Sequence, residues 1–167
     1  VSKGEWDVPE SAWAWRFDRA KSGGGPLVFD DGHHKFALAW HFMGMAEQVH
    51  AWIGSTELTP GSGMFVDSPA IVSWKFASNR MGVLEVVRSP ELEMNTDYYA
   101  QDDRVEITGT KGVIWITRGH GRMLDVPPVM MYSNGQMRGF NDLETDWKYS
   151  FINSTRHMID AYFAGTS

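Results

Sequence analysis

The sequence predicts an α+β fold with one large, mostly antiparallel sheet and helices on one of its faces. Apolar residues recur with a helical period near the start and the end of the chain, and with a period of two in between. The order of elements is therefore helix, many strands, helix, rather than alternating βαβ units. The chain has 167 residues, of which 43% are hydrophobic and 22% charged, which is typical of one folded domain.

Composition narrows the classes of partner. The 21 acidic residues outnumber the 15 basic ones, and lysine and arginine form no cluster, which disfavours nucleic acid as a partner. The absence of cysteine excludes disulfides and thiolate chemistry and fits a cytoplasmic location. No apolar run is long enough to span a membrane. Because Val1 is not a methionine and no closing element follows the last helix, we expect a piece of a longer protein with that helix truncated.

The elements follow from periodicity and turn residues. Residues 1–22 are expected to be irregular and the glycine run 23–25 to form a turn. Helices are predicted over about 33–42 and 149–164, ended by Gly44 and Gly165. Alternation predicts seven strands, at 48–53, 70–76, 82–87, 104–109, 112–117, 129–132 and 136–140.

A nucleotide-binding Rossmann domain is not expected within this chain. No G-x-G-x-x-G pattern follows a predicted strand. Gly119-His120-Gly121 follows a strand but lacks both the third glycine and a subsequent helix.

The densest group of ionisable residues is Asp30-Asp31-Gly32-His33-His34-Lys35, at the start of the first predicted helix. Asp30 and His34 are four residues apart, a spacing that places both on one face of a helical turn. A carboxylate beside an imidazole orients the ring and favours its protonated form, and an oriented histidine is a good general base. Two other interpretations remain open: capping aspartates with a surface histidine pair, or a metal site. The metal site is the weaker because adjacent histidines do not easily converge on one ion and no His-Glu-x-x-His pattern exists.

Four segments resemble one known family. Residues 23–27 followed by 30–34 resemble the G-G-G-x-L…D-x-G-x-H motif that opens the C-terminal domain of glucose–fructose oxidoreductase/inositol dehydrogenase (Gfo/Idh/MocA) proteins. Residues 15–18 resemble the W-R-x-D element that precedes it, and 103–112 look like the family's late hairpin. Residues 151–161 are similar to its F-x-N-E-x-x-H-F-I-D helix. The resemblance spans nearly the whole chain.

This resemblance implies a single C-terminal domain over residues 1–167, which binds substrate and forms homo-oligomers through the exposed sheet face. The Rossmann domain that would hold most of the NAD or NADP is absent from the chain. The implied substrate is a sugar or polyol. His34 would accept the proton of the substrate hydroxyl as hydride leaves for the nicotinamide, and Asp30 would orient the substrate or the imidazole.

The resemblance leaves further roles and alternatives open. The neighbours Arg16, Asp31, His33 and Lys35 are candidates for contacts to sugar hydroxyls or cofactor, with plain surface charge as the other interpretation. One extra residue separates the glycines from Asp30, and Ala37 replaces a second aspartate, so the substrate is expected to differ from inositol. The alternatives are a non-catalytic oligomerisation or sugar-sensing module, an NAD-dependent glycosidase of the same fold, or a small metal-dependent hydrolase.

Overall fold

The computed structural model describes residues 9–94, 96, 101–117 and 123–166. It divides the chain into two compact units, one of residues Val8–Glu91 and one of Val1–Asp7 with Leu92–Ser167. Helices and antiparallel strands occur in both, so the α+β class is confirmed. That residues 1–167 form a single domain stays a prediction.

The unit Val8–Glu91 begins with a series of helical segments, and the three that lie within residues 1–22 replace the irregular chain that the sequence analysis expected there. The helix predicted over about 33–42 is confirmed as the last of the series. Most of the segments are too short to show an apolar period. Gly44 ends the last of them as predicted: its φ is 81° and its N–H donates to the Trp40 carbonyl over 2.7 Å. In order they are α1 (Glu10–Trp13), η1 (Ala14–Phe17), α2 (Arg19–Ser22), the π-helical turn η2 (Pro26–Asp31) and α3 (Gly32–Met43).

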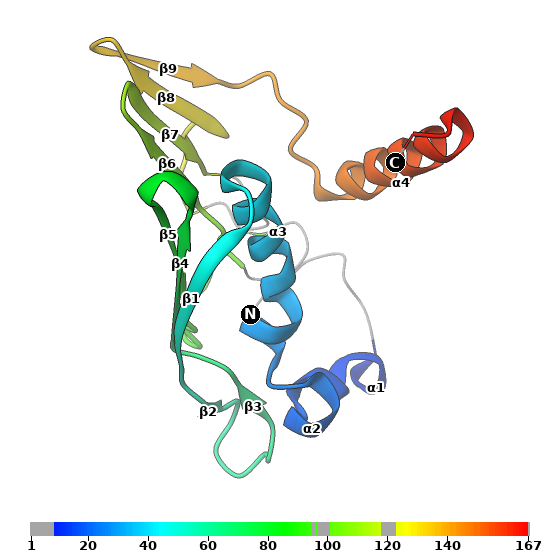
Figure 1. Cartoon of the computed structure of the whole chain (residues 1–167). Helices are drawn as coiled ribbons and strands as arrows, with labels where there is room; N and C mark the ends of the chain where they lie inside the picture. The colour runs from blue at the N-terminus through cyan, green and yellow to red at the C-terminus, as the bar shows by residue number, and fades with distance from the viewer. Residues whose placement is uncertain (1–8, 95, 97–100, 118–122, 167) are drawn as a thin grey trace. The chain divides into compact units, whose positions relative to one another are not determined.

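Three antiparallel strands complete this unit in the order β1 (Ala46–Ile53), β4 (Ala70–Phe76) and β5 (Arg80–Val86). The turn η3 (Ala77–Asn79) joins β4 to β5, and a small pair, β2 (Thr56–Glu57) and β3 (Phe65–Val66), lies between β1 and β4 in sequence. Figure 1 shows α3 running along one face of the three-stranded sheet.

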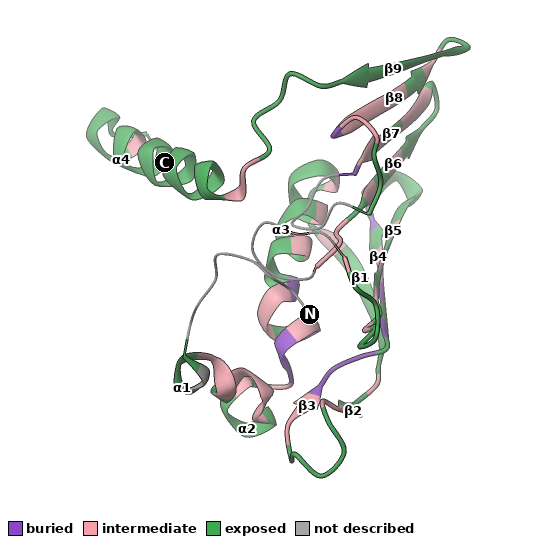
Figure 2. Cartoon of the chain, turned by 180° about the vertical axis from the view of Figure 1, so that it is seen from behind, coloured by how far each residue is buried: buried purple, intermediate pink, exposed green. Residues whose placement is uncertain are grey.

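The core of the unit lies between this sheet and the helical turns. Val28 of η2 is buried together with Ala70 and Val72 of β4, and Leu84 packs against them. The Phe36 ring of α3 stands edge-on to Trp74, with 5.6 Å between centroids. The buried residues of Figure 2 are concentrated around η2 and the chain that leads into β4. Burial of Val28 therefore ties η2 directly to the sheet.

The second unit contains a four-stranded antiparallel sheet in the order β6 (Val105–Gly109), β7 (Gly112–Ile116), β8 (Val129–Ser133) and β9 (Gln136–Phe140). Asn134 and Gly135 turn the chain between β8 and β9 with φ values of 53° and 74°, as the turn signal predicted. Helix α4 (Trp147–Ala164) contains no buried residue and ends at Gly165, whose φ is 66°.

All seven predicted strands are confirmed, within one or two residues at most ends. Within the described residues, hydrogen bonding groups three of them in one sheet and four in another, whereas the sequence analysis expected one sheet. The pair β2–β3 was missed because two residues per strand cannot show alternation. Gly119-His120-Gly121 lies outside the described residues. Among the helices within the described ranges, none combines the length and apolar character needed to cross a membrane.

Candidate functional site

The junction of η2 and α3 carries the candidate site. Asp30 lies near the end of η2 and His34 in the first turn of α3. The Asp30 carboxylate forms an ion pair with the Arg16 guanidinium, 14 residues earlier in η1. Their side chains are 27% and 41% exposed, so solvent screens this pair and its net contribution to stability is small. The structure thus brings Arg16 to the predicted site.

Two further contacts organise the same turn. The His33 Nδ1 atom lies 2.5 Å from the Asp30 carbonyl oxygen, and the His33 and His34 rings are 3.8 Å apart between centroids. One turn along, Lys35 Nζ is 3.2 Å from Asp31 Oδ2, with both side chains about four-fifths buried. Both imidazoles are exposed. Carboxylate, imidazole and ammonium groups therefore share one short, partly accessible segment.

The glycine run approaches two side chains too closely for any larger residue. A Cβ on Gly24 would lie 2.4 Å from the Phe29 ring, and a Cβ on Gly25 would lie 2.3 Å from the Asp67 carboxyl carbon. Both distances are well below van der Waals contact. The glycines are therefore required for the chain to fold back against Phe29 and Asp67.

Asp67 is a residue that the sequence analysis did not single out. It follows β3 and is 2% exposed. Its carboxylate accepts hydrogen bonds from the backbone N–H groups of Leu27 over 2.8 Å, Val28 over 2.6 Å and Phe29 over 3.1 Å. A signal was present: Asp67 stands alone between two apolar strands, where a carboxylate is buried only when it is well paired.

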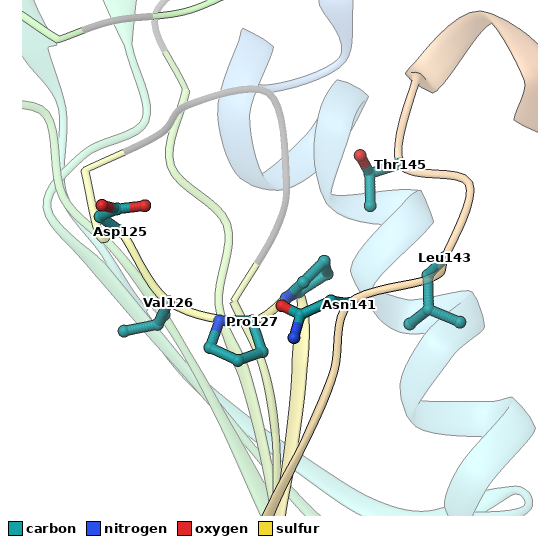
Figure 3. Close-up of a pocket in the computed structure, with 7 residues that line it drawn as sticks. Asp125, Val126, Pro127, Asn141, Leu143 and Thr145 are labelled. Atoms are coloured by element: carbon teal, nitrogen blue, oxygen red, sulfur yellow. The ribbon is translucent and has the colours of Figure 1, made fainter.

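Two other features of the described residues bear on function. The described residues contain no group of three or more histidine, aspartate or glutamate side chains placed to hold a metal ion. The second unit has an open polar pocket of about 360 Å³ between the segments that precede β8 and follow β9 (Figure 3). Its polar side chains are Asp125, Asn141 and Thr145, and none of the residues predicted from sequence to form the site lines it.

Fold and site together define an α+β domain whose polar cluster opens a helix that packs on an antiparallel sheet. The family model described as GFO/IDH/MocA C-terminal domain matches residues 2–115, more than half of the chain. The chain belongs to this family and is a domain of the Gfo/Idh/MocA oxidoreductase type. The match includes the glycine run, Asp30, His34 and Asp67, whereas the predicted motif at 151–161 lies beyond it. Neither curated proteins nor solved structures gave a match.

Proposed function

We propose that this chain is the substrate-side domain of an NAD(P)-dependent oxidoreductase that acts on a hydroxyl group of a sugar or polyol. The observation that carries the proposal is the grouping of Arg16, Asp30 and the exposed His33 and His34 at one turn, in a chain of this family. Charged and imidazole groups on one accessible turn suit a ligand with several hydroxyl groups, because such a ligand both donates and accepts hydrogen bonds.

Oxidation of an alcohol removes a hydride from carbon and a proton from oxygen. His34 is the proposed acceptor of the hydroxyl proton, since a neutral imidazole nitrogen has an available lone pair. The Asp30 carboxylate, held by Arg16, is the proposed acceptor of a hydrogen bond from the substrate. Arg16, Asp31, His33 and Lys35 are proposed to contact the remaining hydroxyl groups or the edge of the cofactor.

The nicotinamide cofactor, which accepts the hydride, is proposed to be held mainly by a separate nucleotide-binding domain. The turn that follows the glycine run does not fit the diphosphate of this cofactor. The N–H groups that follow the glycine run are the donors that a phosphate would need. They are already bonded to Asp67, whose charge would repel a phosphate at that position.

The decisive experiment replaces His34 in the longer protein that joins this domain to its nucleotide-binding domain. We expect His34→Gln to lower kcat for polyol oxidation by roughly 10²–10⁴-fold, the usual worth of a general base. Cofactor affinity, measured by fluorescence titration, should stay unchanged. His41→Gln is the matched control, because His41 is an exposed histidine in the last turn of the same helix.

Undiminished turnover of the His34→Gln variant would show that His34 is not the proton acceptor. A wild-type protein that binds a polyol without oxidising it would favour the sugar-sensing alternative. Cleavage of a glycosidic bond in the presence of NAD would favour the alternative of an NAD-dependent glycosidase.

We also propose that the chain forms homo-oligomers through the face of the β1-β4-β5 sheet opposite α3. Strand register places Trp52, Ile71 and Val83 on this face, and they are 65%, 44% and 68% exposed. Apolar side chains gathered on one sheet face are typical of an interface. In sedimentation velocity, Val83→Glu should shift the protein towards monomer. Val49→Glu is the control, since Val49 is 62% exposed on the other face. A wild-type monomer would contradict the proposal.

A further inference from the structure

We propose that Asp67 is a positioning residue of the substrate site, whose buried carboxylate fixes the turn that presents Asp30 and His34. The assignment of that turn as a substrate site rests on the proposed function. The anchoring itself is read from the contacts of Asp67 and can be tested separately from any activity.

The carboxylate meets the turn at its N-terminal end. Pro26, the first residue of η2, has no N–H group, so the first donors of the turn are those of Leu27, Val28 and Phe29. Asp67 Oδ1 accepts from Leu27, and Oδ2 accepts from both Val28 and Phe29. One side chain therefore satisfies three consecutive backbone donors, two of them with distances of 2.8 Å or less.

Asp67 is itself held firmly, so it can transmit the position of the sheet to the turn. The next residue, Ser68, is 2% exposed and is bonded on two sides. Its Oγ accepts from the Arg88 N–H over 3.0 Å, and its carbonyl accepts from the Thr56 hydroxyl over 2.7 Å. Val66, on the other side of Asp67, is also 2% exposed. The carboxylate thus stands on a fixed segment between β3 and β4.

Two kinds of contact, hydrogen bonds and side-chain packing, hold the turn that carries Asp30 and His34 in place. The backbone of η2 is bonded to Asp67, and the Val28 side chain is buried against β4. Asp30 follows Val28 by two residues, and its N–H donates to the Gly25 carbonyl within the same π-helical turn. The His33 ring contacts the Asp30 carbonyl through Nδ1, and the His34 ring lies beside the His33 ring. Loss of the hydrogen bonds between Asp67 and these amides would therefore make the backbone that carries the Asp30, His33 and His34 side chains more mobile.

An asparagine cannot replace this carboxylate. Asparagine has one acceptor oxygen and an NH₂ group, which would face at least one backbone N–H. At a position that is 2% exposed, water cannot supply the missing acceptor. Asp67→Asn keeps the volume of the side chain, so its effect isolates the hydrogen bonds from packing.

The first test is amide hydrogen exchange by NMR on the ¹⁵N-labelled chain. We expect Asp67→Asn to lower the protection of the Leu27, Val28 and Phe29 amides by roughly tenfold to a hundredfold and to shift the Asp30 and His34 amide resonances. Glu57→Gln is the matched control, because Glu57 also accepts from a backbone amide in a glycine-containing turn, at Gly63. Unchanged protection at these three amides in Asp67→Asn would overturn the anchoring.

Gly25→Ala approaches the same contact from the opposite side. Its Cβ would overlap the Asp67 carboxylate, so it should give the same pattern of lost protection while leaving the carboxylate chemistry intact. If Asp67→Asn fails to fold, this variant decides the question. Protection equal to that of the wild type in Gly25→Ala would contradict the close contact on which the inference depends.

The second test measures turnover in the longer protein. Misplacement of catalytic groups by about 1 Å lowers turnover by roughly a hundredfold, so Asp67→Asn should lower kcat steeply. The KM for NAD(P) should not change, whereas a general loss of structure would alter both. Lost protection with unchanged kcat would overturn the positioning role. Failure of the wild type to oxidise any polyol would instead refute the proposed function, with the exchange result still deciding whether Asp67 anchors the turn.

Discussion

Val28→Ala is the substitution that most directly tests how the site-bearing turn is attached to the core. Val28 is 2% exposed and packs against Ala70 and Val72. Loss of two methyl groups costs about 1.6 kcal/mol in transfer free energy at ~0.8 kcal/mol for each buried carbon. A residual cavity of about 40 Å³ adds about 1 kcal/mol. We therefore expect the free energy of unfolding of this unit to fall by about 2–3 kcal/mol.

Urea denaturation followed by circular dichroism measures this loss, and amide exchange of β4 assigns it to the unit Val8–Glu91. Val49→Ala is the matched control: the same atoms are removed from a side chain that is 62% exposed, and the expected change is within 0.5 kcal/mol. Equal losses in the two variants would refute the reasoning, because burial would then not be what stabilises η2 on the sheet.

Two further predictions concern the turns that connect the strands. Ser78 and Asn79, in the turn between β4 and β5, have positive φ values of 60° and 58°. Asn79→Gly should therefore raise the free energy of unfolding, measured by urea denaturation, by up to ~1 kcal/mol. A lower free energy of unfolding would contradict this backbone geometry. The N–H of Gly63 is the main cause of a pKa of Glu57 below its ordinary value of 4.5. The stabilisation by Glu57 is therefore complete above pH 4.5 and is lost as the pH falls through the lowered pKa. Glu57→Gln should be less stable than the wild type at neutral pH, and the difference should narrow on acidification; a constant difference would contradict the prediction.

Strand positions were predictable because each strand has its own local signal. β4 alternates buried and exposed side chains, with Ala70, Val72 and Phe76 inside and Ile71 and Lys75 outside, so its period of two is visible in the sequence. The division of the strands among separate sheets was not predictable. It depends on which strands pair over long distances, as β1 pairs with β4, and periodicity carries no information about partners.

The candidate site was predictable in part for the same reason. Asp30 and His34 are near neighbours in sequence, so their common location follows from helix spacing alone. The ion pair between Arg16 and Asp30 joins two different helical turns. Asp67 contacts η2 although β1 lies between them in the sequence. Such contacts are set by the packing of the whole unit. The family resemblance suggested Arg16. The position of Asp67 among apolar residues was a signal in the sequence, but it does not tell which backbone groups the carboxylate contacts.

The glycine run shows how one sequence pattern can serve two kinds of site. Glycines followed by a helix form phosphate sites in nucleotide-binding proteins, because the backbone N–H groups of the turn remain available to an anion. Here the anion is part of the chain: the Asp67 carboxylate occupies those N–H groups, and Gly25 is the residue that lets it approach. The donors are consumed in holding the turn against the sheet. Under the proposed function, the turn would therefore offer a ligand its side chains, at Asp30 and His34, rather than these N–H groups.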